Sequence, residues 1–520
     1  MFDIIVRNGL LVDGVSDDPV NTDIGIVGDR VGEVGHIETD ARLEIDASGL
    51  VVAPGFIDIH SHSDYTLLID PRAVSAIHQG VTLEVVGNCG HGCFPLGDPV
   101  VAKKAIYGYS DTLPISWSSA DEYFTLLESV NPALNIVSLV PHGQLRMAVA
   151  GFSDLPLTNA QLRLMKNALS RSLEEGAWGL STGLEYATES GASENEIVAL
   201  CAALRPRDDL YACHTRFRDQ GAPEGVDEAI RTARTAGVRL QVSHLVPRSG
   251  DTDTAECISS VEKAHSAGLD VAFDMHTRLF GFTYLYSVLP PWVHAEGEGR
   301  LTELLRDDSA RERMKEFRSI LSAGGDWNRV VLLDSREYTE YGRRSIASIA
   351  SERRQDPLDC VYDLLLGAQT PSSLMVLIDC HSENQQEFAF SHPLSMPASD
   401  ATTLATEGPL RSNIFHGAYT WAAYFYRFAV KQRRFLSLAQ AVKRLTSVPA
   451  ERLGLIGRGS LVPGNYADLA IFDPEDFAER GTRFEPNQTA RGMVHVLVNG
   501  VPVMLDGTLT GSRSGRVLRK

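Results

Sequence analysis

The sequence lacks several features that would assign it to common functional classes. It has no run of lysine and arginine, and its 48 basic residues are outnumbered by 67 acidic ones, giving a formal net charge of −19. Nucleic acids and anionic lipids attract basic surfaces, so neither is an expected partner. No stretch approaches the roughly 20 apolar residues of a membrane span, and the N-terminal residues lack a signal-peptide pattern. A soluble, cytoplasmic protein is therefore expected.

Cysteine is also scarce. Seven cysteines, an odd number, are scattered over 520 residues, which does not fit a disulfide framework. There is no low-complexity tract or short-period repeat, and the 43% hydrophobic content allows a large core in more than one domain. Individual cysteines are therefore better interpreted as metal ligands or nucleophiles, and Cys89 and Cys93 in "GNCGHGC" are the first candidates.

Both ends of the chain have the pattern of short β-strands. Near the N-terminus, apolar segments are broken by Gly, Asn and Asp, and the segments "YADLAIFD" and "VHVLVNGVPVMLDG" repeat this pattern near the C-terminus. The Asn8-Gly9 and Asn499-Gly500 pairs are typical of hairpin turns between such strands. We predict one small β-sandwich domain built from residues 1–54 and 457–520.

Between the two ends, apolar runs alternate with helical patterns. "VTLEVVG", "LYACH" and "LDVAFDMH" are typical of buried strands, and "TNAQLRLMKNALSRSLEEG" has the apolar spacing of a helix. This alternation indicates parallel strands with crossover helices. We predict an α/β fold in which residues 55–456 form a distorted (β/α)₈ TIM barrel. The charged, helix-like range of about 285–355 interrupts the alternation and is predicted to be an insertion.

The segment "GFIDIHSHSD" places His60 and His62 at the end of an apolar run. Alternate residues of a strand share a face, so both imidazoles should point toward the mouth of the barrel. A histidine can also occupy a core with its hydrogen bonds satisfied, so this pair is insufficient evidence by itself. Its interpretation depends on the residues at the ends of the other strands.

Metal-competent side chains recur where other apolar strands stop. They are Cys89 after "VTLEVV", His214 after "LYAC", His244 after "VRLQVS" and Asp400 after "LSMPAS". The carboxyl ends of barrel strands converge on one face, where such residues can surround an ion. Catalytic zinc takes a few His, Cys or carboxylate ligands and keeps one position open. Cys89, His214 and His244 would supply this set, with His60 and His62 completing it or holding a second ion. The alternative is a buried thiol in a glycine-rich turn beside ordinary core histidines.

These motifs together carry a family resemblance. "GFIDIHSHSD", "GVTLEVVGNCG", "HTR", "VSHL", "PASD" and "RGSLVPGNYADLAIFDP" resemble the amidohydrolase superfamily, and specifically its N-acyl-D-amino-acid deacylase (D-aminoacylase) branch. The resemblance runs over nearly the whole chain, and "GNCG" is its most branch-specific element. It implies a zinc-dependent enzyme that hydrolyses the amide bond of a small N-acyl amino acid, within a distorted barrel that carries a small β-sandwich.

Residue roles follow from the resemblance position by position. Cys89, His214 and His244 resemble the tight zinc ligands, His60 and His62 a weaker second site, and Asp400 the catalytic carboxylate. Zinc would activate water, and Asp400 would act as general base and then as general acid. A helix cap is the structural alternative for Asp400.

Four further residues are candidate substrate contacts. His142 in "PHGQLR" matches a family pattern, with a structural hydrogen bond as its alternative. Arg216 shares the face of His214 and could orient ligands or neutralise charge. His276 and Arg278 in "FDMHTR" end another strand.

The chain departs from the family where the substrate carboxylate is expected to bind. Characterised deacylases have Asp-x-Tyr-Pro-Tyr where this chain has "DMHTR", and an arginine where it has Ile414. Arg411, Arg278 or Arg343 could replace that arginine. We therefore expect a small-molecule substrate and hydrolysis of a C–N bond, with the stereochemistry of the substrate and the formation of a homo-oligomer left open.

Three alternative functions remain. One is a cyclic-amide or other small-amide hydrolase of the same superfamily, although no lysine in a barrel-strand context offers the carbamylated bridge common in dihydropyrimidinases. Another is a non-catalytic barrel, which the retention of all six proposed site residues disfavours. The third uses Cys89 as a thiol nucleophile and predicts indifference to chelators.

Overall fold

A computed structural model describes residues 1–103, 106–110, 112–186, 188–219, 221–296, 298–319, 321–322, 324–369 and 374–520. It is an α/β protein that divides into two units. The first unit comprises Met1–Val246, Thr252–Thr277 and Asn384–Lys520. The second unit comprises Pro247–Asp251 and Arg278–Glu383. In the part of the chain that the structure describes, no helix combines the length and apolarity needed to cross a membrane.

The first unit contains parallel strands in two sheets. One has the order β6-β7-β8, with β6 at Phe56–Asp58, β7 at Val81–Val86 and β8 at Asn135–Ser138. The other has the order β17-β13-β12-β11-β10-β9, with β9 at Val140–Pro141, β10 at Gly179–Gly183, β11 at Leu210–His214, β12 at Arg239–Val242, β13 at Val271–His276 and β17 at Ser395–Ala398. The predicted strands "VTLEVVG", "LYACH" and "LDVAFDMH" are confirmed as β7, β11 and β13. Every residue of these three strands is buried, as expected for parallel strands covered on both faces.

Backbone contacts link these two sheets at both of their edges. Leu139 alone separates β8 from β9 along the chain. At the opposite edge, Ser61 forms a parallel bridge with Ala401. The backbone N–H of Asp400 donates to the carbonyl of His60 at 2.9 Å, and that of His62 donates to the carbonyl of Ala401 at 2.7 Å. The ends of β6 and β17, which are more than 300 residues apart in sequence, therefore lie side by side.

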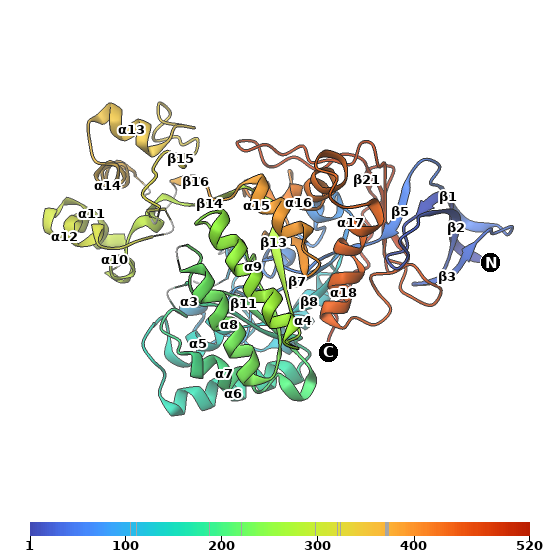
Figure 1. Cartoon of the computed structure of the whole chain (residues 1–520), viewed down its shortest axis with the longest axis horizontal. Coiled ribbons are helices and arrows are strands. Elements are labelled where there is room, and N and C mark those ends of the chain that lie inside the picture. The colour runs from blue at the N-terminus through green and yellow to red at the C-terminus, as the bar shows by residue number, and fades with distance from the viewer. Residues whose placement is uncertain are drawn as a thin grey trace. The chain divides into compact units, whose positions relative to one another are not determined.

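Helices separate the parallel strands and cover them (Figure 1). Their bounds are α1 Thr66–Ile69, α2 Val74–Ile77, α3 Pro99–Ala102, α4 Ala120–Ser129, α5 His142–Ala150, α6 Asn159–Glu174, α7 Glu194–Cys201, α8 Ala222–Ala236, α9 Asp251–Ser266, α15 Glu383–Ser391, α16 His416–Tyr426, α17 Leu438–Leu445 and α18 Ser447–Leu453. The predicted helix "TNAQLRLMKNALSRSLEEG" is confirmed as α6. It begins with a capping box between Thr158 and Gln161 and buries Met165, Leu169 and Leu173. The same apolar spacing that predicted the helix therefore attaches it to the core.

Strands from both termini join in one nine-stranded sheet. Its order is β21-β20-β19-β18-β5-β1-β2-β3, with β4 beside β1. The bounds are β1 Phe2–Leu11, β2 Val20–Val27, β3 Arg30–Gly35, β4 Ala41–Asp46, β5 Val51–Pro54, β18 Leu469–Phe472, β19 Met493–Val498, β20 Val501–Leu505 and β21 Thr508–Leu509. Ile26, Ile471 and Leu497 are fully buried in the core of this sheet.

The two Asn-Gly pairs play different roles in this sheet. Asn499-Gly500 connects β19 to β20, which confirms the predicted hairpin turn. The predicted turn at Asn8-Gly9 is wrong, because both residues lie inside β1, where the register with β2 shifts between Val6 and Gly9. Asn8 has a φ of 60°, so the left-handed conformation that suits a turn here serves a β-bulge instead.

The second unit has its own small sheet and core, and it includes the 285–355 range. The antiparallel order is β14-β16-β15, with β14 at Phe280–Tyr284, β15 at Val330–Leu332 and β16 at Met375–Asp379. Its helices are α10 Pro291–Glu296, α11 Glu298–Arg306, α12 Asp308–Lys315, α13 Ile346–Arg353 and α14 Pro357–Gly367. Leu285, Ile346 and Leu365 are fully buried in this core.

Candidate metal centre

His60 and His62 lie in the segment that continues from β6. Their side chains are buried, with exposed fractions of 0% and 6%, and their ring centroids are 5.3 Å apart. Between them, Ser61 forms the bridge to Ala401, so the backbone here remains extended beyond the strand itself. The alternation of side chains along this segment therefore brings both imidazoles to one side.

The turn after β7 presents Cys89. Three of its residues have left-handed backbone conformations, with φ of 76° at Gly87, 53° at Cys89 and 70° at Gly90. A Cβ at Gly87 would lie 2.3 Å from the carbonyl oxygen of Leu139, so only glycine fits there. The Asn88 side-chain amide donates to the carbonyl of Val85 at 2.9 Å and holds the turn against the end of the strand. The "GNCG" sequence thus forms a tight turn that directs the thiol toward the neighbouring histidines.

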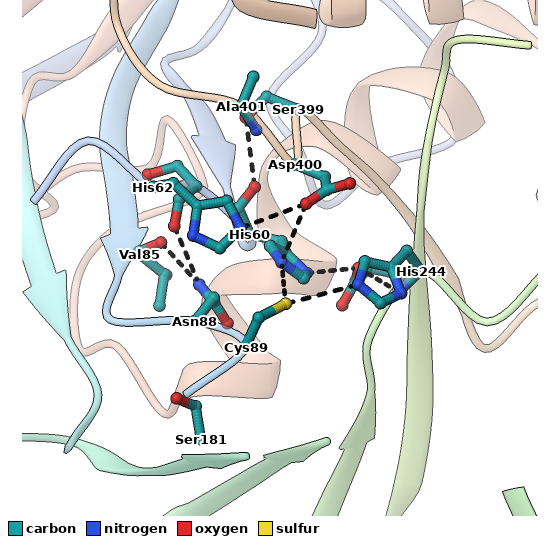
Figure 2. A network of polar contacts seen from close by, with 12 residues as sticks. His60, His62, Val85, Asn88, Cys89, Ser181, His244, Ser399, Asp400 and Ala401 are labelled. Carbon is teal, nitrogen blue, oxygen red and sulfur yellow. Dashed lines mark hydrogen bonds and ion pairs between the residues drawn. The ribbon is translucent and has the colours of Figure 1, made fainter. Parts of the chain in front are cut away.

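Four potential ligands converge at the strand ends, as Figure 2 shows. Cys89 Sγ lies 3.2 Å from His60 Nε2 and 3.4 Å from His244 Nε2. Asp400 Oδ1 lies 3.5 Å from His60 Nε2. One ligand atom from each of the four residues lies within 4.8 Å of all the others. Residues that come after β6, β7, β12 and β17 therefore form one cluster of metal-competent atoms.

Three members of this cluster have strained backbones. The φ angles of Cys89, His244 and Asp400 are 53°, 34° and 43°, in a region that favours glycine. Each such residue costs roughly 1–3 kcal/mol and persists only where its surroundings enforce it. The N–H of His244 donates to Asp274 Oδ1 at 2.8 Å, and the N–H of Asp400 donates to a carbonyl at 2.9 Å. Strain at three converging residues is typical of a functional site.

His214, the last residue of β11, borders the cluster. Its ring centroid is 4.6 Å from that of His244, and the two rings are nearly perpendicular at 89°. Its Nε2 lies 3.1 Å from Glu185 Oε2, and the ring of Tyr186 is 4.7 Å away. His214 therefore adjoins the four-residue cluster, and its Nε2 faces a carboxylate of this chain.

His62 is oriented by Asp400. Its Nε2 lies 3.2 Å from Asp400 Oδ1, and its buried Nδ1 has no hydrogen-bond partner among the residues that the structure describes. Asp400 remains partly accessible, with 16% of its side chain exposed. The carboxylate is thus held by an imidazole on one side and reachable from solvent on the other.

Asp274 is a central residue that the sequence interpretation missed. Its Oδ1 lies 2.9 Å from His60 Nδ1, and its Oδ2 accepts from the amide of Gln241 at 2.9 Å. A carboxylate on Nδ1 fixes the imidazole so that Nε2 is presented to a metal. The available signal was strand alternation, because Asp274 and His276 share one face of β13.

The electrostatics of the cluster favour a thiolate. Burial would raise the pKa of Cys89, but the charge of His60 and hydrogen bonds with His214 and His244 lower it well below its usual range. Burial, with the nearby charge of Arg218, lowers the pKa of His244 to about 4 and favours its neutral form. Against burial, the hydrogen bond with Asp400 raises the pKa of His62 to about 9. Against burial, the charges of Cys89 and Asp274 raise the pKa of His60 well above its usual value. Cys89 as thiolate and His244 as neutral imidazole are therefore in the states that bind metals, whereas His60 and His62 would each lose a proton on binding one.

Two of the candidate substrate contacts bind side chains of the chain itself. His142 is fully buried, with Nδ1 2.6 Å from Glu189 Oε2 and Nε2 3.0 Å from Glu196 Oε1. Arg216 pairs with Glu228 at 2.9 Å and also donates to two backbone carbonyls. The structure therefore places both residues in internal hydrogen-bond networks outside the cluster.

The structure also locates the remaining candidate substrate contacts and the residues considered for binding the substrate carboxylate. His276 ends β13, is buried, and accepts a hydrogen bond at its carbonyl from Gln386. Arg278 is a buried residue of the second unit. Arg343 pairs with Asp334 at 2.8 Å within that unit. Ile414, which occupies the position of the expected arginine, is 48% exposed.

Known proteins share sequence with the whole chain. A model of the amidohydrolase family matches residues 43–314 and 411–504. An N-acyl-D-glutamate deacylase from Alcaligenes xylosoxydans xylosoxydans is 28% identical over 522 residues, which cover 100% of this chain and 96% of the relative. A D-aminoacylase from the same organism is 29% identical over 528 residues, covering 100% and 98%.

Solved structures share the fold. One is the N-acyl-D-glutamate deacylase from Bordetella bronchiseptica, complexed with zinc and a phosphonate inhibitor that mimics the tetrahedral intermediate of the reaction. It is 27% identical, with a TM-score of 0.82 and 100% of both chains covered. A D-aminoacylase structure gives a TM-score of 0.81 at 27% identity, also with 100% of both chains covered. A D-hydantoinase, at 15% identity and a TM-score of 0.54, shares the fold alone.

Proposed function

Because this chain belongs to the amidohydrolase family, we propose that it is a zinc-dependent hydrolase that cleaves the amide bond of an N-acyl-D-amino acid. The observation that carries the proposal is the convergence of His60, Cys89, His244 and Asp400 at the ends of parallel strands. An N-acyl-D-glutamate deacylase and a D-aminoacylase match along the full chain, and the structure of another N-acyl-D-glutamate deacylase contains zinc.

The spacing of the ligand atoms fits zinc. Tetrahedral zinc with bonds of about 2.0 Å to nitrogen and 2.3 Å to sulfur separates its ligands by roughly 3.3–3.5 Å. The separations of 3.2 and 3.4 Å between Cys89 Sγ and the two imidazole nitrogens are close to these values. Thiolate, imidazole and carboxylate are also the ligand types that zinc prefers. The residues present therefore suit this ion.

We assign the tight site to Cys89, His244 and His214, with His60 and His62 adjoining it as a weaker second site. Cys89 and His244 are supported most directly, by their mutual contact. His60 and His214 are competing candidates for the third position, because both contact the thiol, while His214 Nε2 also faces Glu185. Single-residue variants of these two histidines distinguish the assignments by their zinc content.

Asp400 is placed to move the proton that amide hydrolysis requires. When bound, zinc polarises a carbonyl and makes water acidic enough to lose a proton near neutral pH. Asp400 would accept that proton as the water oxygen bonds to the carbonyl carbon, and would deliver it to the nitrogen as the C–N bond breaks. The contact with His62 at 3.2 Å orients the carboxylate for both steps.

The proposal extends to the architecture. We infer that the parallel strands form a distorted (β/α)₈ barrel over residues 55–456, with the second unit as an insertion. The near-continuity of β8 and β9 and the bridge between Ser61 and Ala401 support closure of the barrel. The nine-stranded sheet supports a β-sandwich of residues 1–54 and 457–520.

Zinc analysis and a substrate panel test this function. We expect about one tightly bound zinc per chain, and hydrolysis of N-acyl-D-amino acids that chelation abolishes and added zinc restores. The panel also contains L-enantiomers and cyclic amides. Turnover restricted to cyclic amides would replace the proposed substrate class. Chelator-resistant turnover that thiol alkylation abolishes would favour Cys89 as a nucleophile.

A further inference from the structure

Strand β10 packs against the turn that carries Cys89, and Ser181 of this strand lies beside the turn (Figure 2). β10 pairs with β11 in parallel, so that Ser181 lies opposite Ala212 and Gly183 lies opposite His214. Both β10 residues are buried. Because alternate residues of a strand share a face, Ser181 and Gly183 lie on the same side of β10. This side of the strand therefore faces the metal centre.

The hydroxyl of Ser181 bridges the two residues that bracket Asn88 and Cys89. The backbone N–H of Gly90 donates to Ser181 Oγ at 3.1 Å, and the same hydroxyl donates to the carbonyl of Gly87. In a closed β-turn the first carbonyl and the fourth N–H would bond each other. Here one hydroxyl lies between the two groups and binds both. Ser181 therefore sets how far apart the two ends of the turn lie.

Gly183 allows the strand to approach the turn closely. A Cβ at this position would lie 2.1 Å from the carbonyl oxygen of Cys89, so a side chain could be added only if the turn moved. The next ligand candidate along the sheet, His214, lies opposite Gly183 on β11. β10 therefore leaves room for the Cys89 peptide at the level where β11 presents an imidazole.

The turn needs such support because its backbone is strained. Cys89 has a φ of 53°, and a residue other than glycine persists in this region only where its surroundings enforce it. Its Sγ lies 3.2 Å from His60 Nε2 and 3.4 Å from His244 Nε2, so a small rotation of the turn would separate these atoms. The two hydrogen bonds of Ser181 oppose that rotation from a fully buried position.

We propose that Ser181 is a positioning residue for the thiol ligand, and that its hydroxyl holds Cys89 Sγ in the direction that zinc binding requires. The inference rests on the proposed function, because it takes zinc as the ion at this centre. Residues that hold a ligand in place typically contribute roughly 10–100-fold in metal affinity. Ser181 would thus act through Cys89, without contact with the metal or the substrate.

Zinc binding by two variants of Ser181 tests the inference. Ser181→Ala removes both hydrogen bonds, so we expect zinc affinity, measured by competition with a chromophoric chelator, to fall by about 10–100-fold. Ser181→Thr keeps the hydroxyl and should restore most of the affinity. At saturating cobalt, the thiolate-to-cobalt charge-transfer band should be weaker per bound ion in Ser181→Ala than in the parent protein. This band reports the direction of the thiol independently of turnover.

Thr182→Val is the matched control. It removes the neighbouring hydroxyl, which contacts the hydroxyl of Tyr211 at 3.1 Å on the other face of β10. Urea unfolding of the metal-free proteins compares stability, and we expect Thr182→Val to keep the parent zinc affinity whatever its stability. Parent-like affinity in Ser181→Ala, a loss in Thr182→Val equal to that in Ser181→Ala, or equal losses in Ser181→Ala and Ser181→Thr would overturn the positioning role.

Two further outcomes also decide the inference. If Ser181→Ala does not fold while Thr182→Val does, the hydroxyl serves the fold and the positioning role is overturned. If the parent protein binds no zinc, the proposed function fails, and the role of Ser181 fails with it. Zinc binding by the parent together with any of the contrary results above would overturn the role of Ser181 alone.

Discussion

Two buried histidine clusters in the first unit differ in how their ring nitrogens are paired. At His142 both nitrogens face carboxylates, and Arg146 adds hydrogen bonds of 2.6 and 2.7 Å to Glu196. At the metal centre the Nε2 atoms of His60 and His244 instead face the sulfur of Cys89. One cluster holds a histidine between two carboxylates, whereas the other gathers a thiol, imidazoles and a carboxylate around one point.

We propose that this difference separates a metal ligand from a structural histidine. Sulfur, imidazole nitrogen and carboxylate oxygen gathered at one point form a set of ligands that zinc can bind, whereas the ring of His142 faces two carboxylates. The backbone supports this interpretation, because Cys89, His244 and Asp400 have left-handed conformations and His142 does not. Burial alone does not separate the clusters, since His60 and His142 are both fully buried.

Replacing the thiol should break the metal centre most severely. Cys89→Ala removes the sulfur that both His60 and His244 face, so we expect zinc affinity to fall by more than ~100-fold and turnover to be lost with the metal. Cys93→Ala, which removes a buried thiol from the same loop, is the matched control and should retain zinc. Metal analysis after dialysis measures the difference. Full zinc content in Cys89→Ala would remove the thiolate from the centre.

Replacing the carboxylate should separate chemistry from metal binding. Asp400→Asn keeps the shape of the side chain but removes the proton acceptor, so we expect kcat to fall by roughly 10²–10⁴-fold with zinc retained. Steady-state kinetics and metal analysis on the same preparation test this. Near-normal turnover would exclude Asp400 as general base.

Asp274→Asn should weaken the centre indirectly. The change removes the carboxylate that holds His60 Nδ1 at 2.9 Å, and such outer contacts typically contribute 10–100-fold in metal affinity. Competition with a chromophoric chelator measures the affinity. An affinity equal to that of the parent protein would show that Asp274 does not orient the ligand.

His142→Gln should leave the zinc affinity unchanged and affect stability. Removing one partner from a buried charged cluster costs about 3–5 kcal/mol. Against burial, Glu189 and Glu196 raise the pKa of His142, so its contribution is complete below the unfolded value of about 6.5 and is lost as pH rises through the folded value. Urea unfolding of both proteins from pH 6 upward should show a difference that shrinks with pH. A pH-independent difference would contradict a charged His142.

Sequence periodicity predicted which strand-end residues lie near one another, but not the hydrogen-bond partners of the histidines. Strand alternation and the positions of strand ends predicted that Cys89, His214 and His244 would meet, with His60, His62 and Asp400 beside them. Four of these six residues, His60, Cys89, His244 and Asp400, form the cluster, and His214 and His62 adjoin it. Glu185 and Glu189, which face His214 and His142, lie in the connection between β10 and α7, whose path no periodic pattern predicts. Asn8-Gly9 shows the same limit, since a left-handed residue such as Asn8 suits a turn and a bulge equally. Periodicity indicates which face a side chain occupies, whereas its bonding partner depends on loops.

The ligand environment of bound zinc tests the central claim most directly. X-ray absorption at the zinc edge of the loaded protein should show one sulfur at about 2.3 Å together with nitrogen or oxygen ligands at about 2.0 Å. Cys89→Ala should lose the sulfur contribution, and Cys93→Ala should keep it. A spectrum without sulfur in the parent protein, or one that Cys89→Ala leaves unchanged, would contradict a zinc centre built on Cys89.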